Sequence, residues 1–324
     1  MTALIVSGVG SVIGYGLLRS MRAARPRITL IGIDTSASAV GREWCDHFEV
    51  SPAVESDDYA GWLRSAIVRY DATLLIPGFE QDVHFLSDNR DSFSDLKCAL
   101  ALNSRRLIDV AKDKWLLHLE LLKLGGEATI PTYCEGDYEY LSGLLGNHFL
   151  LKPRNGYASK GIVEVRSSDD FEPHRERLGS PLIAQKIVGS QEEEYTVSVF
   201  GDGRGSFSSS IALRRTLGPD GATSKAWSVE ENTLQTKLSK LCDYFLPIGP
   251  TNFQFRRHED DWLLLEINPR VSSSTSIRSA LGYNEAEMAW NYFVEGRLPN
   301  QPSLKSAFVA RYLEDIVYEH GDHI

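Results

Sequence analysis

Short apolar runs alternate with amphipathic helical stretches along the first hundred residues. Continuous apolar strands separated by helices are typical of a parallel sheet whose faces are covered by helices. The pattern therefore predicts a doubly wound, Rossmann-like α/β domain over residues 1–103. The runs that we interpret as strands are ALIVS at 3–7, ITLIGID at 28–34, HFEVS at 47–51, ATLLIPG at 72–78 and CALALN at 98–103.

The pattern changes near Ser104, where two helices are predicted, the second capped by Asp113. Strand-like runs then become frequent and are joined by short polar turns, which is typical of antiparallel hairpins. The sequence thus predicts a second, mixed α/β region after the doubly wound domain. Its main predicted features are strands around a glycine-containing loop at 148–165, strands at 181–189 and 194–203, a hairpin at 252–270 and helical residues at 275–296.

Composition excludes several classes of protein. The 324 residues carry a net charge of −10, whereas a broad nucleic-acid surface is basic. No apolar stretch reaches the roughly 20 residues of a membrane-spanning helix, and no basic segment precedes the apolar start. The four cysteines lack CxxC spacing, which favours reduced thiols over a zinc site or disulfides. We expect a cytoplasmic enzyme without nucleic-acid or membrane partners.

A glycine-rich turn, GVGSVIG at 8–14, follows the first apolar run, and Asp34 ends the second run about twenty residues later. This order is typical of dinucleotide-binding folds. However, three residues separate Gly10 from Gly14, where the fingerprint has two. An NAD-dependent oxidoreductase is therefore an alternative interpretation, but it leaves the polar residues of the second region unexplained.

The predicted hairpin at 252–270 gathers polar side chains. Residues two apart on a strand face the same way, so Glu266, Asn268 and Arg270 begin on one face, and Gln254 can lie opposite Glu266. Carboxylate and amide oxygens suit Mg²⁺, and a nearby arginine can balance charge on a transferring phosphoryl group. Taken alone, a surface hairpin with an Asn–Pro turn is an equally good interpretation.

Two lysines and a loop extend this polar set. Lys152 ends an apolar run, where a half-buried cation is costly without an anionic partner. The loop at 154–161 offers glycines and backbone donors that could fold over phosphates, although a simple hairpin turn explains it too. Lys114 stands at a helix start and, taken alone, would be an ordinary solvated lysine.

Taken in this order, the motifs resemble those of the ATP-grasp superfamily, and in particular the large chain of carbamoyl-phosphate synthase. The most specific stretch runs from Gly249 to Tyr283 and is similar to the family's metal-binding hairpin. The likeness extends to Asp113–Lys114, KPRNGYASKG and QKIVGSQEEEYTV. The resemblance implies a pre-ATP-grasp domain at 1–103, a first subdomain with linker helices at 104–183 and a nucleotide- and metal-binding subdomain at 184–324.

The resemblance also implies roles for individual residues. Glu192 is the better match to the ribose contact, and Glu194 is the alternative if the loop is shifted in register; Glu193 is interpreted as a solvated loop residue. Arg270 is expected to act in catalysis with Lys114 and Lys152, and Gln254, Glu266 and Asn268 are expected to bind the metal. The residues matched to the nucleotide are Lys114, Lys152, Ser159, Lys160, Gln185, Lys186, Ile187, Val188, Glu192 and Glu194.

The chain departs from carbamoyl-phosphate synthase because it has one ATP-grasp copy and no room for the remaining domains. The expected activity is an ATP-dependent carboxylate–amine ligase that forms an acyl phosphate and uses ATP with Mg²⁺, or Mn²⁺ as a substitute. Its expected partners are a small carboxylate and an amine, and a homodimer is compatible with the resemblance. A non-catalytic nucleotide-binding protein is a further alternative, which the intact Glu266, Asn268 and Arg270 disfavour.

Four residues are candidates for substrate contacts. Glu80 and Asp82 follow a strand of the first domain and could bind an amine, or simply cap the next helix. Arg214 and Arg215 could clamp a carboxylate, or both could be solvated. Because adjacent residues on a strand face opposite ways, only one of the two arginines is expected to face the site.

Overall fold

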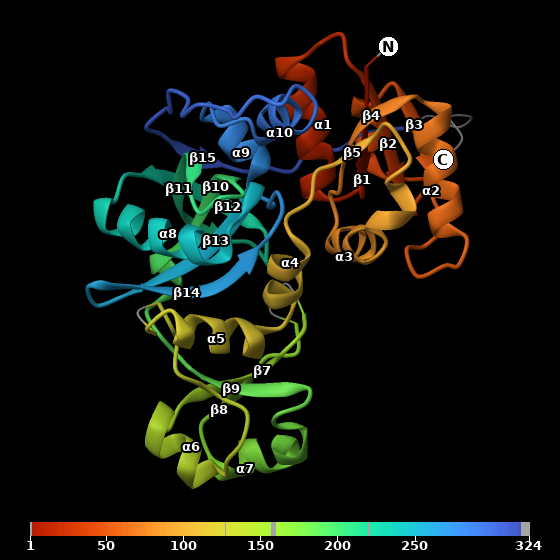
Figure 1. The fold of residues 1–324 in the computed structure, drawn as a ribbon. Helices are drawn as coiled ribbons and strands as arrows, with labels where there is room; N and C mark the ends of the chain where they lie inside the picture. The colour runs from red at the N-terminus through yellow and green to blue at the C-terminus, as the bar shows by residue number, and fades with distance from the viewer. Residues whose placement is uncertain (1, 127, 157–159, 220, 319–324) are drawn as a thin grey trace.

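The computed structural model describes residues 2–126, 128–156, 160–219 and 221–318, and it contains three β-sheets. Figure 1 shows the N-terminal domain at one end, a small sheet at the other end and a large antiparallel sheet between them. The described helices are too short and too polar to span a membrane. The expected α/β fold class is confirmed.

The N-terminal domain contains a five-stranded parallel sheet in the order β3-β2-β1-β4-β5. Alternate side chains of β1 enter different cores: Ile5 packs with α2, whereas Leu4 and Val6 pack with α1. The sheet is thus covered on both faces, as its continuous apolar strands predict. Its elements are β1 (Ala3–Ser7), α1 (Val12–Ala24), β2 (Thr29–Asp34), η1 (Val40–Trp44), β3 (His47–Val50), α2 (Tyr59–Arg69), β4 (Ala72–Ile76), α3 (Glu80–Asp88), η2 (Arg90–Phe93) and β5 (Ala99–Leu100).

The glycine-rich turn allows α1 to pack closely on β1. Gly8 has a φ of +62°, which favours glycine, and a Cβ on Gly14 would lie 2.3 Å from the carbonyl oxygen of Gly8. The backbone N–H of Gly10 donates to Asp34, and that of Gly14 donates to the hydroxyl of Ser11. Since protein acceptors take these donors, the turn is an architectural feature and does not present them to a phosphate.

Two helices then lead to a four-stranded sheet in the order β6-β9-β7-β8. Its core includes Phe149, Leu151 and Phe171 and forms a separate cluster of buried side chains. The expected boundary at residue 183 lies within β9. The elements are α4 (Arg105–Lys112), α5 (Lys114–Lys123), β6 (Thr132–Tyr133), α6 (Tyr138–Leu145), β7 (Phe149–Pro153), β8 (Val163–Val165), α7 (Ser168–Phe171), η3 (Glu172–Arg177) and β9 (Leu182–Lys186).

The large sheet is antiparallel, with the order β14-β13-β10-β11-β12-β15. Helix α8 packs on one face, and the segment of α9 and α10 packs on the other. The expected helical stretch at 275–296 is present as these last two helices. The elements are η4 (Gln191–Glu193), β10 (Glu194–Asp202), β11 (Phe207–Leu217), β12 (Thr223–Val229), α8 (Asn232–Phe245), β13 (Ile248–His258), β14 (Asp261–Asn268), α9 (Thr275–Ala280), α10 (Glu285–Phe293) and β15 (Phe308–Ala310).

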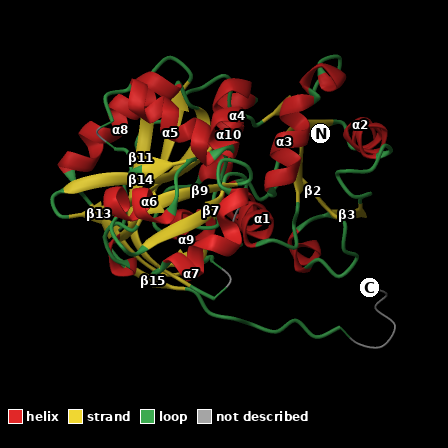
Figure 2. Cartoon of the chain, turned by 90° about the horizontal axis from the view of Figure 1, so that it is seen from below, coloured by secondary structure: helices red, strands yellow, loops and turns green. Residues whose placement is uncertain are grey.

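The C-terminal part of the chain joins the large sheet to the N-terminal domain. Ala286, Ala289 and Trp290 of α10 belong to the same buried cluster as Leu17 and Leu18 of α1. After β15 the chain runs back alongside the N-terminal domain (Figure 2), and the hydroxyl of Tyr318 donates to Glu43 over 3.1 Å. The sheet that carries the hairpin at 252–270 is therefore packed directly against the doubly wound domain.

Candidate active site

The predicted hairpin forms with the predicted register. Gln254 on β13 pairs with Glu266 on β14, and a bulge follows between Gln254 and Phe255. Phe253 and Phe255 are fully buried in the core, which turns Gln254 toward the opposite face of the sheet. The alternation of apolar and polar residues therefore determines which side chains leave the core.

A chain of hydrogen bonds runs from the hairpin to the N-terminal domain. The amide of Asn268 donates to Glu266 over 3.0 Å, and Arg270 donates to the Asn268 oxygen over 3.1 Å. Arg270 also donates to Glu80 at the start of α3 over 2.7 Å. Burial alone would raise the pKa of Glu80, but His84 and Arg270 lower it to about 2. Glu80 is therefore an anion that anchors Arg270 across the two domains.

A small cavity of about 30 Å³ lies along this chain of contacts. It is lined by Glu80 and His84 from α3, Lys114 from α5, Glu266 and Asn268 from the end of β14, and Arg270 just after that strand. The Nζ of Lys114 donates to the carbonyl of Gly156 over 2.9 Å, and both residues line the cavity. Lys114 thus lies close to the metal-ligand candidates, as expected.

Lys152 on β7 is half-buried, and its Nζ donates to the amide oxygen of Gln185 over 2.7 Å. The Gln185 amide in turn donates to Thr132 over 3.0 Å. Burial is the main cause that lowers the pKa of Lys152 to about 8; the positive charges of Arg256 and Lys114 add to it, while Glu266 and Glu194 oppose it. Lys152 therefore shares an electrostatic environment with the hairpin carboxylate.

Gln185 is one of the residues matched to the nucleotide. Its amide oxygen accepts one hydrogen bond, from Lys152, and keeps a second lone pair. The following backbone remains available: among the described residues, no protein hydrogen bond engages the main chain of Ile187 or Val188. Lys186 is partly different, since its N–H donates to the carbonyl of Pro131 over 3.0 Å.

The two ribose candidates lie in contrasting surroundings. Glu192 is exposed on η4, whereas Glu194 is 4% exposed and bonds to Arg215 over 2.7 Å and to Arg256 over 2.6 Å. Burial would raise the pKa of Glu194, but these two guanidinium groups lower it. Arg215 also donates to Gln254 over 2.7 Å, which connects Glu194 to the hairpin. Glu194 is thus committed to an arginine network, and Glu192 stays accessible.

The four candidates for substrate contacts do not lie at one site. Arg215 is buried in the network just described, whereas Arg214 lies on the other face of β11, over the Trp227 ring at 5.1 Å. The two arginines therefore lie on opposite faces of β11, and Arg215 is the one that contacts Gln254. Glu80 and Asp82 do not share a site, because Asp82 turns into the N-terminal domain and accepts hydrogen bonds from Ser7 and Tyr59.

Two further residues of the site escaped the sequence interpretation. The Nε2 of His84 lies 3.7 Å from a Glu80 oxygen, one helical turn along α3, and Arg256 lies on the same strand as Gln254. Helical spacing from Glu80 and strand spacing from Gln254 would have indicated both. Lys160 is exposed at the end of the glycine-containing loop, and Ser159 lies outside the described residues.

Comparisons with known proteins agree with this architecture. Residues 182–316 match the family model described as ATP-grasp in the biosynthetic pathway with Ter operon. The solved N5-carboxyaminoimidazole synthetase from Staphylococcus aureus, complexed with ADP, is 18% identical with a TM-score of 0.73; the match covers 96% of this chain and 82% of that one. A search of the curated proteins gave no match.

Two other structures extend the comparison. The biotin carboxylase domain dimer of 2-oxoglutarate carboxylase from Hydrogenobacter thermophilus, in complex with MgADP, ADP and bicarbonate, has a TM-score of 0.70 at 14% identity, covering 95% of this chain and 73% of that chain. The L-amino acid ligase from Bacillus licheniformis has a TM-score of 0.67 at 15% identity, covering 91% and 74%. The chain therefore has the ATP-grasp fold with a Rossmann-like N-terminal domain, and the resemblance to the ATP-grasp ligases is confirmed.

Proposed function

We propose that this protein is an ATP-dependent ligase that joins a small carboxylate to an amine. A carboxylate oxygen attacks the γ-phosphorus of ATP, the bond to the bridging oxygen breaks, and ADP leaves with the electron pair. The amine nitrogen then attacks the acyl carbon, loses a proton to water and expels phosphate. Phosphorylation is needed because a free carboxylate is a poor electrophile, and no protein nucleophile takes part.

One observation carries this proposal: Arg270, Asn268 and Glu266 form a continuous bonded chain beside Lys114 in a single cavity. Phosphoryl transfer depends chiefly on positioning and on neutralising the charge of the phosphate oxygens. We assign Lys114 and Lys152 to the nucleotide phosphates and Arg270 to the transferring phosphoryl group. The Nζ of Lys114 donates to the Gly156 carbonyl at this cavity, and because an ammonium group has three donors it can bind phosphate oxygens as well.

The hairpin also provides suitable oxygen donors for Mg²⁺. Glu266 supplies a carboxylate, and the amide oxygens of Gln254 and Asn268 each accept one hydrogen bond here, which leaves a second lone pair on each. Mg²⁺ bound by Gln254, Glu266 and Asn268 would supply charge neutralisation for the nucleotide phosphates. The solved biotin carboxylase domain with MgADP supports the same choice of ion and nucleotide.

The remaining contacts of the nucleotide are assigned to the segment that follows β9. We assign the purine edge to the backbone of Ile187 and Val188 and the ribose hydroxyls to Glu192. Glu80 and Arg215 then hold the substrate side, Glu80 by fixing Arg270 and Arg215 by facing Gln254. The identity of the carboxylate would be determined by these contacts, and bicarbonate in the solved biotin carboxylase domain supports a small one.

The reaction is tested by screening ATP consumption against pooled carboxylates and amines, with mass spectrometry of the products. With a carboxylate labelled with heavy oxygen, one label should appear in the released phosphate, and hydroxylamine should trap the acyl phosphate as a hydroxamate. Label that stays entirely in the organic product would contradict an acyl phosphate. Saturable binding of NAD in place of ADP would contradict the whole assignment.

Glu266→Gln provides the sharpest variant, since it keeps the shape of the side chain and removes its charge. We expect turnover to fall about a hundredfold or more, while the unfolding midpoint stays close to that of the parent protein. Asp260→Asn is the matched control, because Asp260 is an exposed carboxylate in the turn of the same hairpin. Equal turnover in the two variants would locate the metal elsewhere.

A further inference from the structure

A cavity lies inside the N-terminal domain, apart from the candidate active site. Its volume is about 610 Å³, and it opens at the carboxyl ends of β1, β2 and β3. This volume lies within the range of small-molecule sites, and the carboxyl edge of an open parallel sheet is where such folds bind ligands. Phe79 and Asp82 of the α3 region face this cavity, whereas Glu80 and His84 face the active site.

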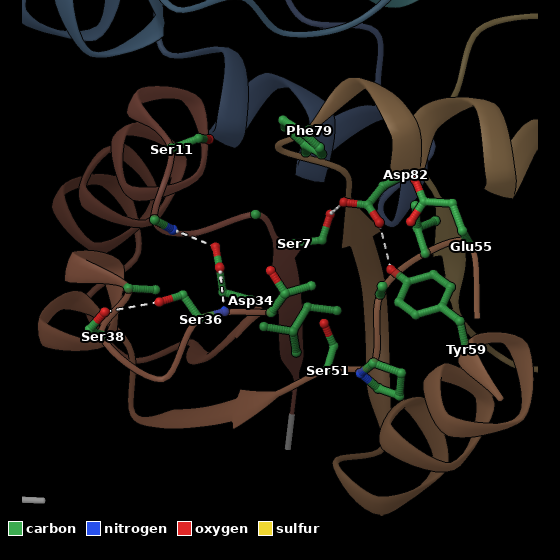
Figure 3. A pocket seen from close by; sticks show the side chains of 18 of the residues that line it. Ser7, Ser11, Asp34, Ser36, Ser38, Ser51, Glu55, Tyr59, Phe79 and Asp82 are labelled. Atoms are coloured by element: carbon green, nitrogen blue, oxygen red, sulfur yellow. Dashed lines mark hydrogen bonds between the residues drawn. The ribbon is translucent and has the colours of Figure 1, made fainter. Parts of the chain in front are cut away.

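All charged residues that line the cavity are acidic. Asp34, Glu55 and Asp82 line it, and no lysine or arginine is among its lining residues. Figure 3 shows Asp34 on one side of the space and Asp82 with Glu55 on the other. Burial raises the pKa of Asp82, and the charges of Asp34 and Glu55 raise it further. The charges of Asp34 and Glu55 therefore oppose ionisation of Asp82, and a cation in the space between them would relieve this repulsion.

The position of Asp82 is built into the fold. It is 7% exposed, and its two oxygens accept from the hydroxyl of Ser7 over 2.7 Å and from that of Tyr59 over 2.6 Å. These bonds hold the carboxylate at the wall of the cavity (Figure 3). Each oxygen keeps further acceptor capacity for a ligand donor.

The other walls offer free polar groups. Within the described ranges, no protein hydrogen bond engages the side chains of Thr35, Ser51 or Glu55, and all three line the cavity. Hydroxyl groups on a ligand would form hydrogen bonds with these three side chains. Val54, Tyr59 and Phe79 add apolar contact area.

A dinucleotide does not suit this cavity. Its pyrophosphate would add negative charge among three carboxylates, and the turn donors at Gly10 and Gly14 already bond to Asp34 and Ser11. We propose that the cavity is a binding site for a small organic amine that also carries hydroxyl groups. The proposal does not depend on ligase activity, since the cavity is complete without the nucleotide.

The test is isothermal titration calorimetry of the full chain, without nucleotide, with two matched pairs of probes. Glucosamine is compared with glucose, and 2-amino-1,3-propanediol with glycerol, so that each pair differs in one ammonium group. We expect at least one amine to bind saturably and its neutral counterpart to bind at least about tenfold more weakly. Absence of saturable binding by both amines, or equal binding within both pairs, would overturn the proposal.

Two variants locate the binding. Glu55→Gln removes an exposed lining carboxylate without touching the Asp82 contacts and should weaken amine binding by about tenfold. Asp57→Asn is the control, because Asp57 is an exposed carboxylate in the same loop that does not line the cavity. Equal affinities of these two variants would place the amine elsewhere. Since ADP binding is measured separately, failure here leaves the ligase assignment intact.

Discussion

Arg270 and Arg278 lie on the same short segment after β14, yet their surroundings differ completely. Arg278 is fully buried and bonds to Glu285, Asn252, Thr196 and Ser272 at 2.5–3.1 Å. Arg270 is 13% exposed at its side chain and bonds to Glu80 of another domain beside a cavity. Arg278 is part of a buried core, whereas Arg270 lies at the wall of a cavity.

The physical cost of the two arrangements also differs. A charge without solvent access needs hydrogen-bond partners, and residues of β10, β13 and α10 accept from the two terminal nitrogens of Arg278. Among the described residues, the Nε of Arg278 and one oxygen of Glu285 have no such partner. The Arg270 cluster keeps a solvent-facing side, so its charges can be compensated by an incoming anion. A buried arginine network therefore indicates structural specificity here, whereas a half-buried network at a domain boundary indicates chemistry.

The largest expected effect comes from breaking the Arg278 cluster. Arg278→Met leaves the buried Glu285 carboxylate without its cation, so the free energy of unfolding should fall by about 3–5 kcal/mol. Urea unfolding measures this loss. The double variant Arg278→Met with Glu285→Leu should recover much of it, because no buried charge remains unpaired. A loss below about 1 kcal/mol in the single variant would contradict the comparison.

Arg270→Met should affect turnover more than stability. Turnover should fall about a hundredfold to a thousandfold, because a donor to the transferring group is removed, while the loss in unfolding free energy stays smaller than for Arg278→Met. Initial rates of ATP consumption and urea unfolding provide the two readouts. If stability collapses and the residual activity per folded molecule is normal, Arg270 is a structural residue like Arg278.

The affinity for ADP at the candidate active site should also depend on pH. The pKa of Lys152 in the folded protein is about 8, so its charge is lost as the pH rises through 8. ADP affinity should therefore weaken above pH 8, by at most about tenfold per pH unit. Calorimetry of ADP binding between pH 7 and 9.5 measures the slope. Lys152→Arg should flatten it because arginine stays charged, and Lys123→Arg, on an exposed residue, should leave it unchanged.

The smallest effect is expected at Gln254. Gln254→Glu adds a carboxylate opposite Glu266, so half-maximal turnover should need severalfold less Mg²⁺. Arg215 already donates to this side chain, so part of the new charge will be compensated by the guanidinium. Mg²⁺ titrations at saturating ATP compare the variant with the parent protein. Superimposable curves would remove Gln254 from the metal site.

Several features were predictable because they depend on local geometry. The period of two along β14 places Glu266 and Asn268 on one face, and the apolar alternation in β13 sets Gln254 against Glu266. The glycines of the first turn likewise indicate that the helix and the strand pack closely together. Such signals need only the backbone path of a few residues, which the sequence constrains directly.

Other features were decided only by the tertiary structure. The sequence offers Glu80 and Asp82 as equivalent anions, and no pattern in it distinguishes Arg278 as a buried residue. Packing of α10 against β10 and β13 buries Arg278, and the partner of Arg270 is 190 residues away in the chain. Burial and charge pairing depend on which distant elements pack together, and the spacing of residues along one helix or strand does not determine this packing. Hence the sequence identified the polar residues of the site, while the arrangement of the domains determined which of them remain accessible to a ligand.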